Sequence, residues 1–211
     1  MLLRRRFLSL LGGLVLGACL LGNAPAHAEA TQADASKFIE KLADNAITMV
    51  ADKSLSETSR NDRFRTLFEQ SFDIPAIGKF VLARYWKAAS PDQQQEFLRL
   101  FEDMNVLTWA KRFKDYSGEK LQVTNANKDA EHGDWLVESK LQRVQGPPVV
   151  VQWRLHEVAE GLRVTDIFVE GVSMAQTSRQ DYSATLQGNG GKLDALLSAM
   201  RTKIDQMKAA G

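Results

Sequence analysis

The spacing of apolar side chains changes at Gly118, and this change constrains the fold more than any other feature of the sequence. Between residues 33 and 117 the apolar side chains recur every three or four positions, which is typical of helices with one buried face. Over 135–142 and 149–156 they alternate with polar side chains, which predicts strands with one dry face. A dry sheet face needs a cover, and only the helices can supply it. The sequence therefore predicts an α+β fold.

Cap and turn signals set the boundaries of the predicted elements. Pro75 suits the first turn of a short helix that runs to about Trp86. Ser90 and Gln93 have the spacing of a capping box at the start of a long helix. Short turns join the strands, so we expect an antiparallel meander sheet of about four strands, covered on one face by helices. The predicted helices cover residues 33–50, 75–86, 90–117, 193–204 and a segment that begins at about 57; the predicted strands begin at 121, 135, 149 and 162.

The N-terminal segment has the composition of an export signal. An arginine run at 4–6 precedes an apolar stretch over 7–21, and residues 26–28 form a small-x-small cleavage motif. The apolar stretch is shorter than the roughly 20 residues that a membrane-spanning helix needs. We therefore expect residues 1–28 to be removed as a signal peptide and residues 29–211 to form a single domain.

Two properties of this signal stay open at the level of sequence. The arginines before Phe7 fit the twin-arginine export pattern, and an ordinary Sec signal has the same features. The run from Leu16 to Cys19 resembles a lipobox, in which the cysteine is lipidated. The cleavage motif at 26–28 favours release as a soluble periplasmic protein, with a lipidated envelope interaction protein as the alternative.

Composition excludes several classes of function. Removal of the three leader arginines leaves 24 basic and 26 acidic side chains, a net charge of −2. This balance does not favour nucleic-acid binding, which depends on an excess of basic side chains. The single cysteine, Cys19, lies in the leader, so no disulfide is expected in the mature domain.

No motif supports catalysis or metal binding. Gly171 to Ala175 follows a strand as a nucleophile elbow does, but Ala175 stands where the elbow needs its last glycine. The glycine-rich run 188–192 is followed by Leu193 where a phosphate loop needs Ser or Thr. The acidic side chains and the histidine over 129–134 are typical of a solvated turn. We expect no enzyme activity, cofactor or metal.

Four ordered motifs carry a family resemblance. They are FDIPAIGKFVLARYW at 72–86, SPDQ at 90–93, VEGVS at 169–173 and GKLD at 191–194. In this order the chain resembles the MlaC-type, or toluene-tolerance, family of periplasmic phospholipid carriers. The family includes a branch associated with hopanoid lipids, and the motifs do not separate the two branches.

The resemblance implies a soluble carrier that shuttles lipids through the periplasm. It implies an apolar pocket between sheet and helices that encloses acyl chains of a phospholipid or hopanoid. It also implies two docking partners, an inner-membrane ABC-type lipid transporter complex and an outer-membrane lipoprotein or porin complex. The cargo, the direction of transport and the oligomeric state do not follow from the sequence.

Apolar side chains on the strands and helices are the expected tail contacts. On the strands these are Val137, Leu141, Val149, Val151, Trp153, Ile167 and Val169; on the helices they are Phe80, Val81, Phe97, Phe101 and Met104. Arg84 and Lys87 flank Tyr85-Trp86, and we expect them to contact a lipid head group or a partner.

The alternation of the last strand does not settle which of its faces points inward. Leu162, Val164 and Phe168 share one side, whereas Ile167 and Val169 share the other.

A small-molecule enzyme of a cone-shaped α+β fold, such as an isomerase, is the alternative from another class. It needs an acid–base pair inside the pocket, and Asp166 is the strand-borne acid with apolar neighbours.

Overall fold

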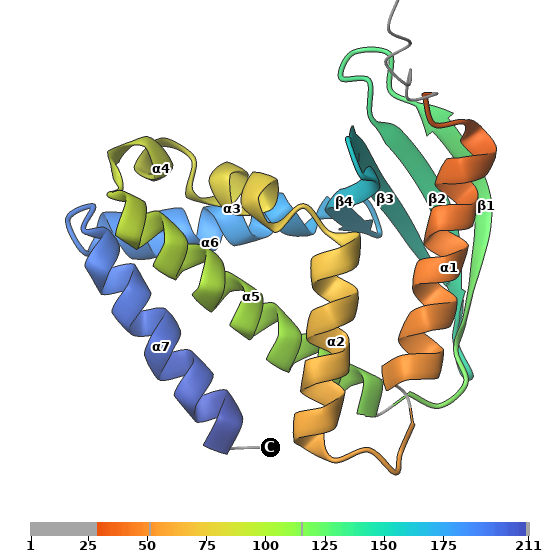
Figure 1. Ribbon diagram of the computed structural model, residues 1–211, viewed down its shortest axis with the longest axis horizontal. Coiled ribbons are helices and arrows are strands. Elements are labelled where there is room, and N and C mark those ends of the chain that lie inside the picture. The colour runs from red at the N-terminus through yellow and green to blue at the C-terminus, as the bar shows by residue number, and fades with distance from the viewer. Residues whose placement is uncertain (1–28, 51, 115, 210–211) are drawn as a thin grey trace, which may run out of the picture.

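The computed structural model describes residues 29–50, 52–114 and 116–209, so the predicted signal peptide lies outside the described residues. Five helices come first, then the sheet, then two more helices (Figure 1). The helices are α1 (Gln32–Val50), α2 (Glu57–Ser71), α3 (Ile74–Leu82), α4 (Arg84–Ala88), α5 (Pro91–Lys114), α6 (Met174–Gly188) and α7 (Leu193–Ala209). The strands are β1 (Lys120–Lys128), β2 (Trp135–Gln142), β3 (Val149–Val158), β4 (Gly161–Val169) and β5 (Val172–Ser173).

The strands form one antiparallel sheet in the order β1-β2-β3-β4-β5, which confirms the predicted meander. The sheet has five strands where about four were expected, because Val172 and Ser173 pair with β4 as a short edge strand. Two residues are too few to show the alternation that identifies a strand in sequence.

A bulge in β4 settles which of its residues point inward. The pairing of β4 with β3 skips Thr165, so this residue has no partner opposite it. One extra residue reverses the alternation beyond it. Pairing then puts Phe168 on the outer face, opposite Gln152. The inner face of β4 is formed by Leu162, Val164, Ile167 and Val169.

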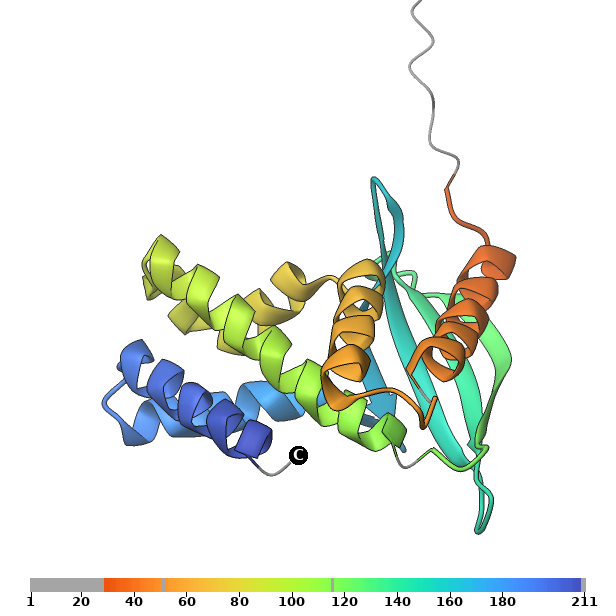
Figure 2. The ribbon, with the colours of Figure 1, turned by 60° about the horizontal axis from the view of Figure 1, so that its bottom comes forward.

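Two hydrophobic clusters hold the fold together. The first lies between α1 and the sheet and contains Ile39 and Val137, both fully buried. The second lies among the helices and contains Phe97. Phe72 and Phe113 pack against both clusters. In Figures 1 and 2, α1 lies along the sheet, and α3 to α7 extend away from it.

The helices largely follow their predicted boundaries. The expected capping box is present: Ser90 N–H donates to Gln93 Oε1 over 3.0 Å, and Gln93 N–H donates to Ser90 Oγ over 3.2 Å. The single helix expected over 75–86 is wrong, because Ala83 has φ of 50° and divides it into α3 and α4. Helix α6 was not predicted, since its sequence MAQTSRQDYSATLQG is rich in polar residues.

Candidate functional site

The inner face of the sheet carries three apolar rows that run across neighbouring strands. The rows are Val137–Trp153–Ile167, Ser139–Val151–Val169 and Leu141–Val149. Every strand residue predicted to contact lipid tails lies in one of them. No side chain in the rows is ionisable, so this part of the face is uncharged.

Burial of this face is uneven. Val137, close to α1, is fully buried. Trp153, Ile167 and Val169 are only partly buried, although they lie on the same face. Each Å² of apolar surface that stays in contact with water loses about 25 cal/mol of hydrophobic stabilisation. The helices therefore cover the inner face incompletely at Trp153, Ile167 and Val169.

The hydroxyl group of Ser139 pairs with polar groups of the inner face and adds no charge to it. Its side chain is 1% exposed, and its Oγ donates to the carbonyl oxygen of Val151 over 2.9 Å. The same Oγ accepts a hydrogen bond from Trp153 Nε1 over 3.0 Å. The indole N–H is satisfied within the sheet, so the ring is fixed in orientation. Sequence reasoning passed over Ser139, although a serine at an inward position beside a tryptophan on the next strand is a usable signal.

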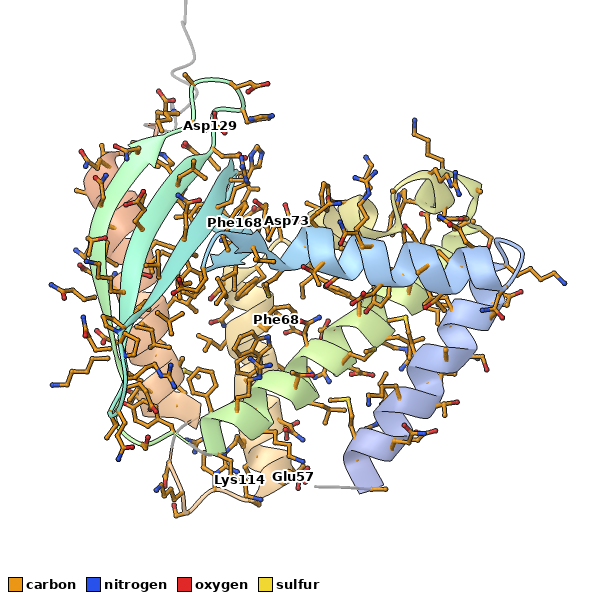
Figure 3. The ribbon with its side chains drawn as sticks, turned by 180° about the vertical axis from the view of Figure 1, so that it is seen from behind. Glu57, Phe68, Asp73, Lys114, Asp129 and Phe168 are labelled. Carbon is orange, nitrogen blue, oxygen red and sulfur yellow. The ribbon has the colours of Figure 1, made fainter. Side chains whose placement is uncertain are left out.

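The sheet and α5 face one another across side chains of α2. In Figure 3, Phe68 of α2 lies between the strands and α5. Its ring is 4.5 Å from that of Phe72, centroid to centroid, and 6.1 Å from that of Phe64. This aromatic group therefore lines the boundary between the sheet and the helical part.

Four of the five helix residues predicted as tail contacts belong to the helical cluster. Val81 and Phe97 are fully buried, and Phe101 is 5% exposed. Met104 is partly buried beside them. Phe97 packs against Phe101 at a ring distance of 5.9 Å. The structure does not bring these residues and the strand rows into one cluster, so their contact with a lipid stays a prediction.

Phe80 lies apart from the other predicted tail contacts. It is 42% exposed, and the Arg179 guanidinium lies 5.1 Å from the centre of its ring. It lines a hollow of about 470 Å³ with Phe168 of the outer sheet face. Ile77, Val81 and other apolar residues of α3 are buried, which turns the side chain at position 80 outward.

Asp166 is a structural residue of β4 whose carboxylate contacts the start of α6. Its carboxylate accepts hydrogen bonds from Ser173 Oγ at 2.6 Å and from the backbone N–H groups of Ala175 at 3.0 Å and Ile167 at 2.8 Å. An anion near a helix N-terminus is stabilised by the exposed N–H groups. These contacts explain the acid among apolar neighbours without a role in proton transfer.

The turn between β1 and β2 holds a network of charged side chains. Asp129 accepts a hydrogen bond from the Glu131 N–H and contacts His132, which holds the pKa of Asp129 at about 2. Arg154 contacts both Asp129 and Asp134 at 3.2 Å. Among the described residues, no group of three or more acidic, histidine or cysteine side chains is arranged to hold a metal ion.

Arg84 and Lys87 lie on α4 and are exposed. The Arg84 guanidinium lies over the Tyr85 ring, 4.9 Å from its centre, and donates to the Tyr85 hydroxyl. Figure 1 places α4 at the end of the helical part that is remote from the sheet. A head group beside the strand rows therefore lies far from α4, and contact with a partner protein stays the better prediction for this pair.

Comparison with known proteins fits this arrangement. The family model for MlaC protein matches residues 40–202, which is most of the chain. The chain belongs to the MlaC protein family. This confirms the resemblance carried by the four ordered motifs.

Individual members of the MlaC family show distant similarity. The chain is 23% identical over 137 residues to the intermembrane phospholipid transport system binding protein MlaC of Haemophilus influenzae, covering 64% of this chain and 63% of that protein. It is 22% identical over 139 residues to the toluene tolerance protein ttg2D of Pseudomonas putida, covering 65% of this chain and 64% of that protein. The chain thus spans slightly less than two thirds of the length of these relatives.

A solved structure has the same fold. It is a phospholipid-binding protein from Ralstonia solanacearum in complex with a phospholipid, with a TM-score of 0.72 and 20% sequence identity. The match covers 82% of this chain and 98% of that chain. The α+β fold of the MlaC family is therefore shown for this chain. Within its described residues, no helix is long and apolar enough to cross a membrane.

Proposed function

We propose that this protein is a periplasmic carrier that holds the acyl chains of a phospholipid against the inner face of the sheet. The observation that carries the proposal is the uncharged, incompletely covered face formed by the three strand rows. Family membership supports it, as do the similarity to an intermembrane phospholipid transport system binding protein and the phospholipid bound by the Ralstonia protein.

The physical need for such a carrier follows from the insolubility of the cargo. Exposing one methylene to water costs about 0.8 kcal/mol, so a chain of roughly sixteen carbons costs more than about 10 kcal/mol. A lipid therefore does not cross an aqueous compartment at a useful rate unless its tails are enclosed. Enclosure requires an apolar, uncharged wall, while the head group can stay in water.

In this proposal the carrier works between two membranes. Residues 1–28 direct it to the periplasm, and it exchanges lipid with an inner-membrane ABC-type complex and an outer-membrane lipoprotein or porin complex. Arg84 and Lys87 are exposed on α4, away from the strand rows, which suits contact with one of these partners. The cargo we propose is a glycerophospholipid, because no observation on the fold favours a hopanoid.

Native mass spectrometry of the protein purified from the periplasm without detergent tests this function. We expect a species heavier than the mature chain by the mass of one phospholipid, together with phosphorus-containing lipid in a solvent extract. As a control for uptake, the same protein is stripped of lipid, incubated with lipid vesicles, purified again and measured in the same way. Protein that is free of lipid in both preparations would contradict the proposal.

A further inference from the structure

A cleft lies among the helices, away from the strand rows. It has a volume of about 410 Å³ and is lined by α2, α5 and α7. Figure 3 shows two of its lining residues, Glu57 and Lys114, side by side at the ends of α2 and α5. This volume falls within the range of small-ligand sites, about 300–1,000 Å³.

The rim of the cleft is positively charged. Lys111 and Lys114 come from α5 and Lys203 comes from α7, and all three are exposed. Arg60 of α2 also lines the cleft and donates to the carbonyl oxygen of Asp52 over 2.9 Å. Glu57 is the one carboxylate among the lining residues, so the three lysines and one anion leave an excess of two positive charges. The predicted mature chain has a net charge of −2, so the excess is local.

The remaining lining residues give the cleft an apolar floor. Leu107 and Ala110 of α5 and Met207 of α7 line it, and Ala110 is fully buried. A cationic rim above an apolar floor is complementary to an anion that carries a small apolar group.

Lysines in the last turns of α5 have a second effect, because cations there favour the negative end of the helix. That effect does not account for Lys203, which comes from α7 and lines the same cleft. Convergence of lysines from two helices is the feature that points to a ligand.

We propose that this cleft binds a phosphate ester, with the phosphate held by Lys111, Lys114 and Lys203 and a short apolar group on the floor. The phosphate of a lipid head group and free inorganic phosphate share this chemistry. The inference rests on the cleft itself and stands whether or not the strand rows hold acyl chains.

Titration of the isotope-labelled mature protein with hexyl phosphate, followed by amide NMR, tests the inference. We expect shifts in α5 and α7, with saturable binding that weakens as salt screens the lysines. Replacing each lysine by glutamine should weaken binding about threefold to fivefold, and K111Q/K114Q/K203Q should abolish measurable binding. Lys140→Gln on β2 is the matched control and should bind as the wild type does.

Titration with inorganic phosphate identifies the source of the phosphate, and titration with hexanol is the control for the apolar group. Tighter binding of hexyl phosphate than of inorganic phosphate supports a lipid head group, and equal binding supports free phosphate in the same site. Hexanol should not bind at this cleft. The inference is overturned if hexyl phosphate fails to bind, if the triple variant binds it unchanged while folded, or if the shifts fall on the strand rows instead.

Discussion

At the scale of single residues, the clearest feature is a buried serine that completes the apolar face. Ser139 satisfies the indole N–H of Trp153 and the carbonyl of Val151 with one hydroxyl. Replacing it by alanine leaves the indole N–H without its partner, which costs about 1–3 kcal/mol when the group stays buried. We expect Ser139→Ala to lower the free energy of unfolding by this amount in urea titrations. The exposed Ser198→Ala on α7 should change it by less than about 0.5 kcal/mol.

A second residue-scale prediction concerns acid. The pKa of Asp129 is lowered from 3.8 to about 2 by the Glu131 N–H and by His132. A carboxyl group with a depressed pKa stabilises the fold above its unfolded pKa, and this contribution is lost as pH falls through the folded value. The Asp129→Asn variant should therefore have a lower melting temperature than the wild type at neutral pH. The two melting temperatures should converge between about pH 4 and pH 2. A gap that stays constant over this range would contradict the assignment.

At the scale of elements, the junction between β4 and α6 depends on one carboxylate. Asp166 of β4 receives three hydrogen bonds, two of them from Ser173 and Ala175 at the start of α6, and Asp166→Ala removes all of them. Each intramolecular hydrogen bond contributes about 0.5–1.5 kcal/mol. We expect a lower melting temperature with bound lipid retained, measured by calorimetry and native mass spectrometry. Asp181→Ala, an exposed acid within α6, should leave both unchanged. Loss of lipid in a folded Asp166→Ala protein would assign Asp166 a direct role at the site.

Most helices and strands of this protein could be predicted from its sequence. Helical spacing and strand alternation depend on which face is buried, so they identified α5 and the meander correctly. The bulge at Thr165 leaves no mark in composition, because one inserted residue changes only the register. The outward position of Phe80 likewise depends on which side of α3 packs against other elements.

At the scale of the whole molecule, the two clusters explain how a stable fold can keep an open apolar face. One cluster joins α1 to part of the sheet, and the other joins the helices to one another. Among the described residues, Phe72 and Phe113 pack against both clusters and Val149 and Val169 belong to neither, so the strand rows do not all take part in this packing. Periodicity identifies apolar faces but does not distinguish a filled interior from one that admits a guest. For that reason the assignment of the strand residues as lipid contacts rests on the family resemblance and not on periodicity.

The lipid content of two neighbouring variants on β3 tests whether the inner face of the sheet holds the acyl chains. Val151 is 7% exposed on the inner face, and Val150 is 45% exposed on the outer face. An unpaired charge in an apolar site costs several kcal/mol. We therefore expect Val151→Asp to lose bound phospholipid in native mass spectrometry and Val150→Asp to keep it.

Because Val151→Asp also affects stability, Val149→Arg at a half-buried inner position gives a second variant with less effect on packing. Lipid lost from the folded inner-face variants and retained by Val150→Asp is the result that our account predicts. Folded inner-face variants that keep a full complement of phospholipid would contradict it.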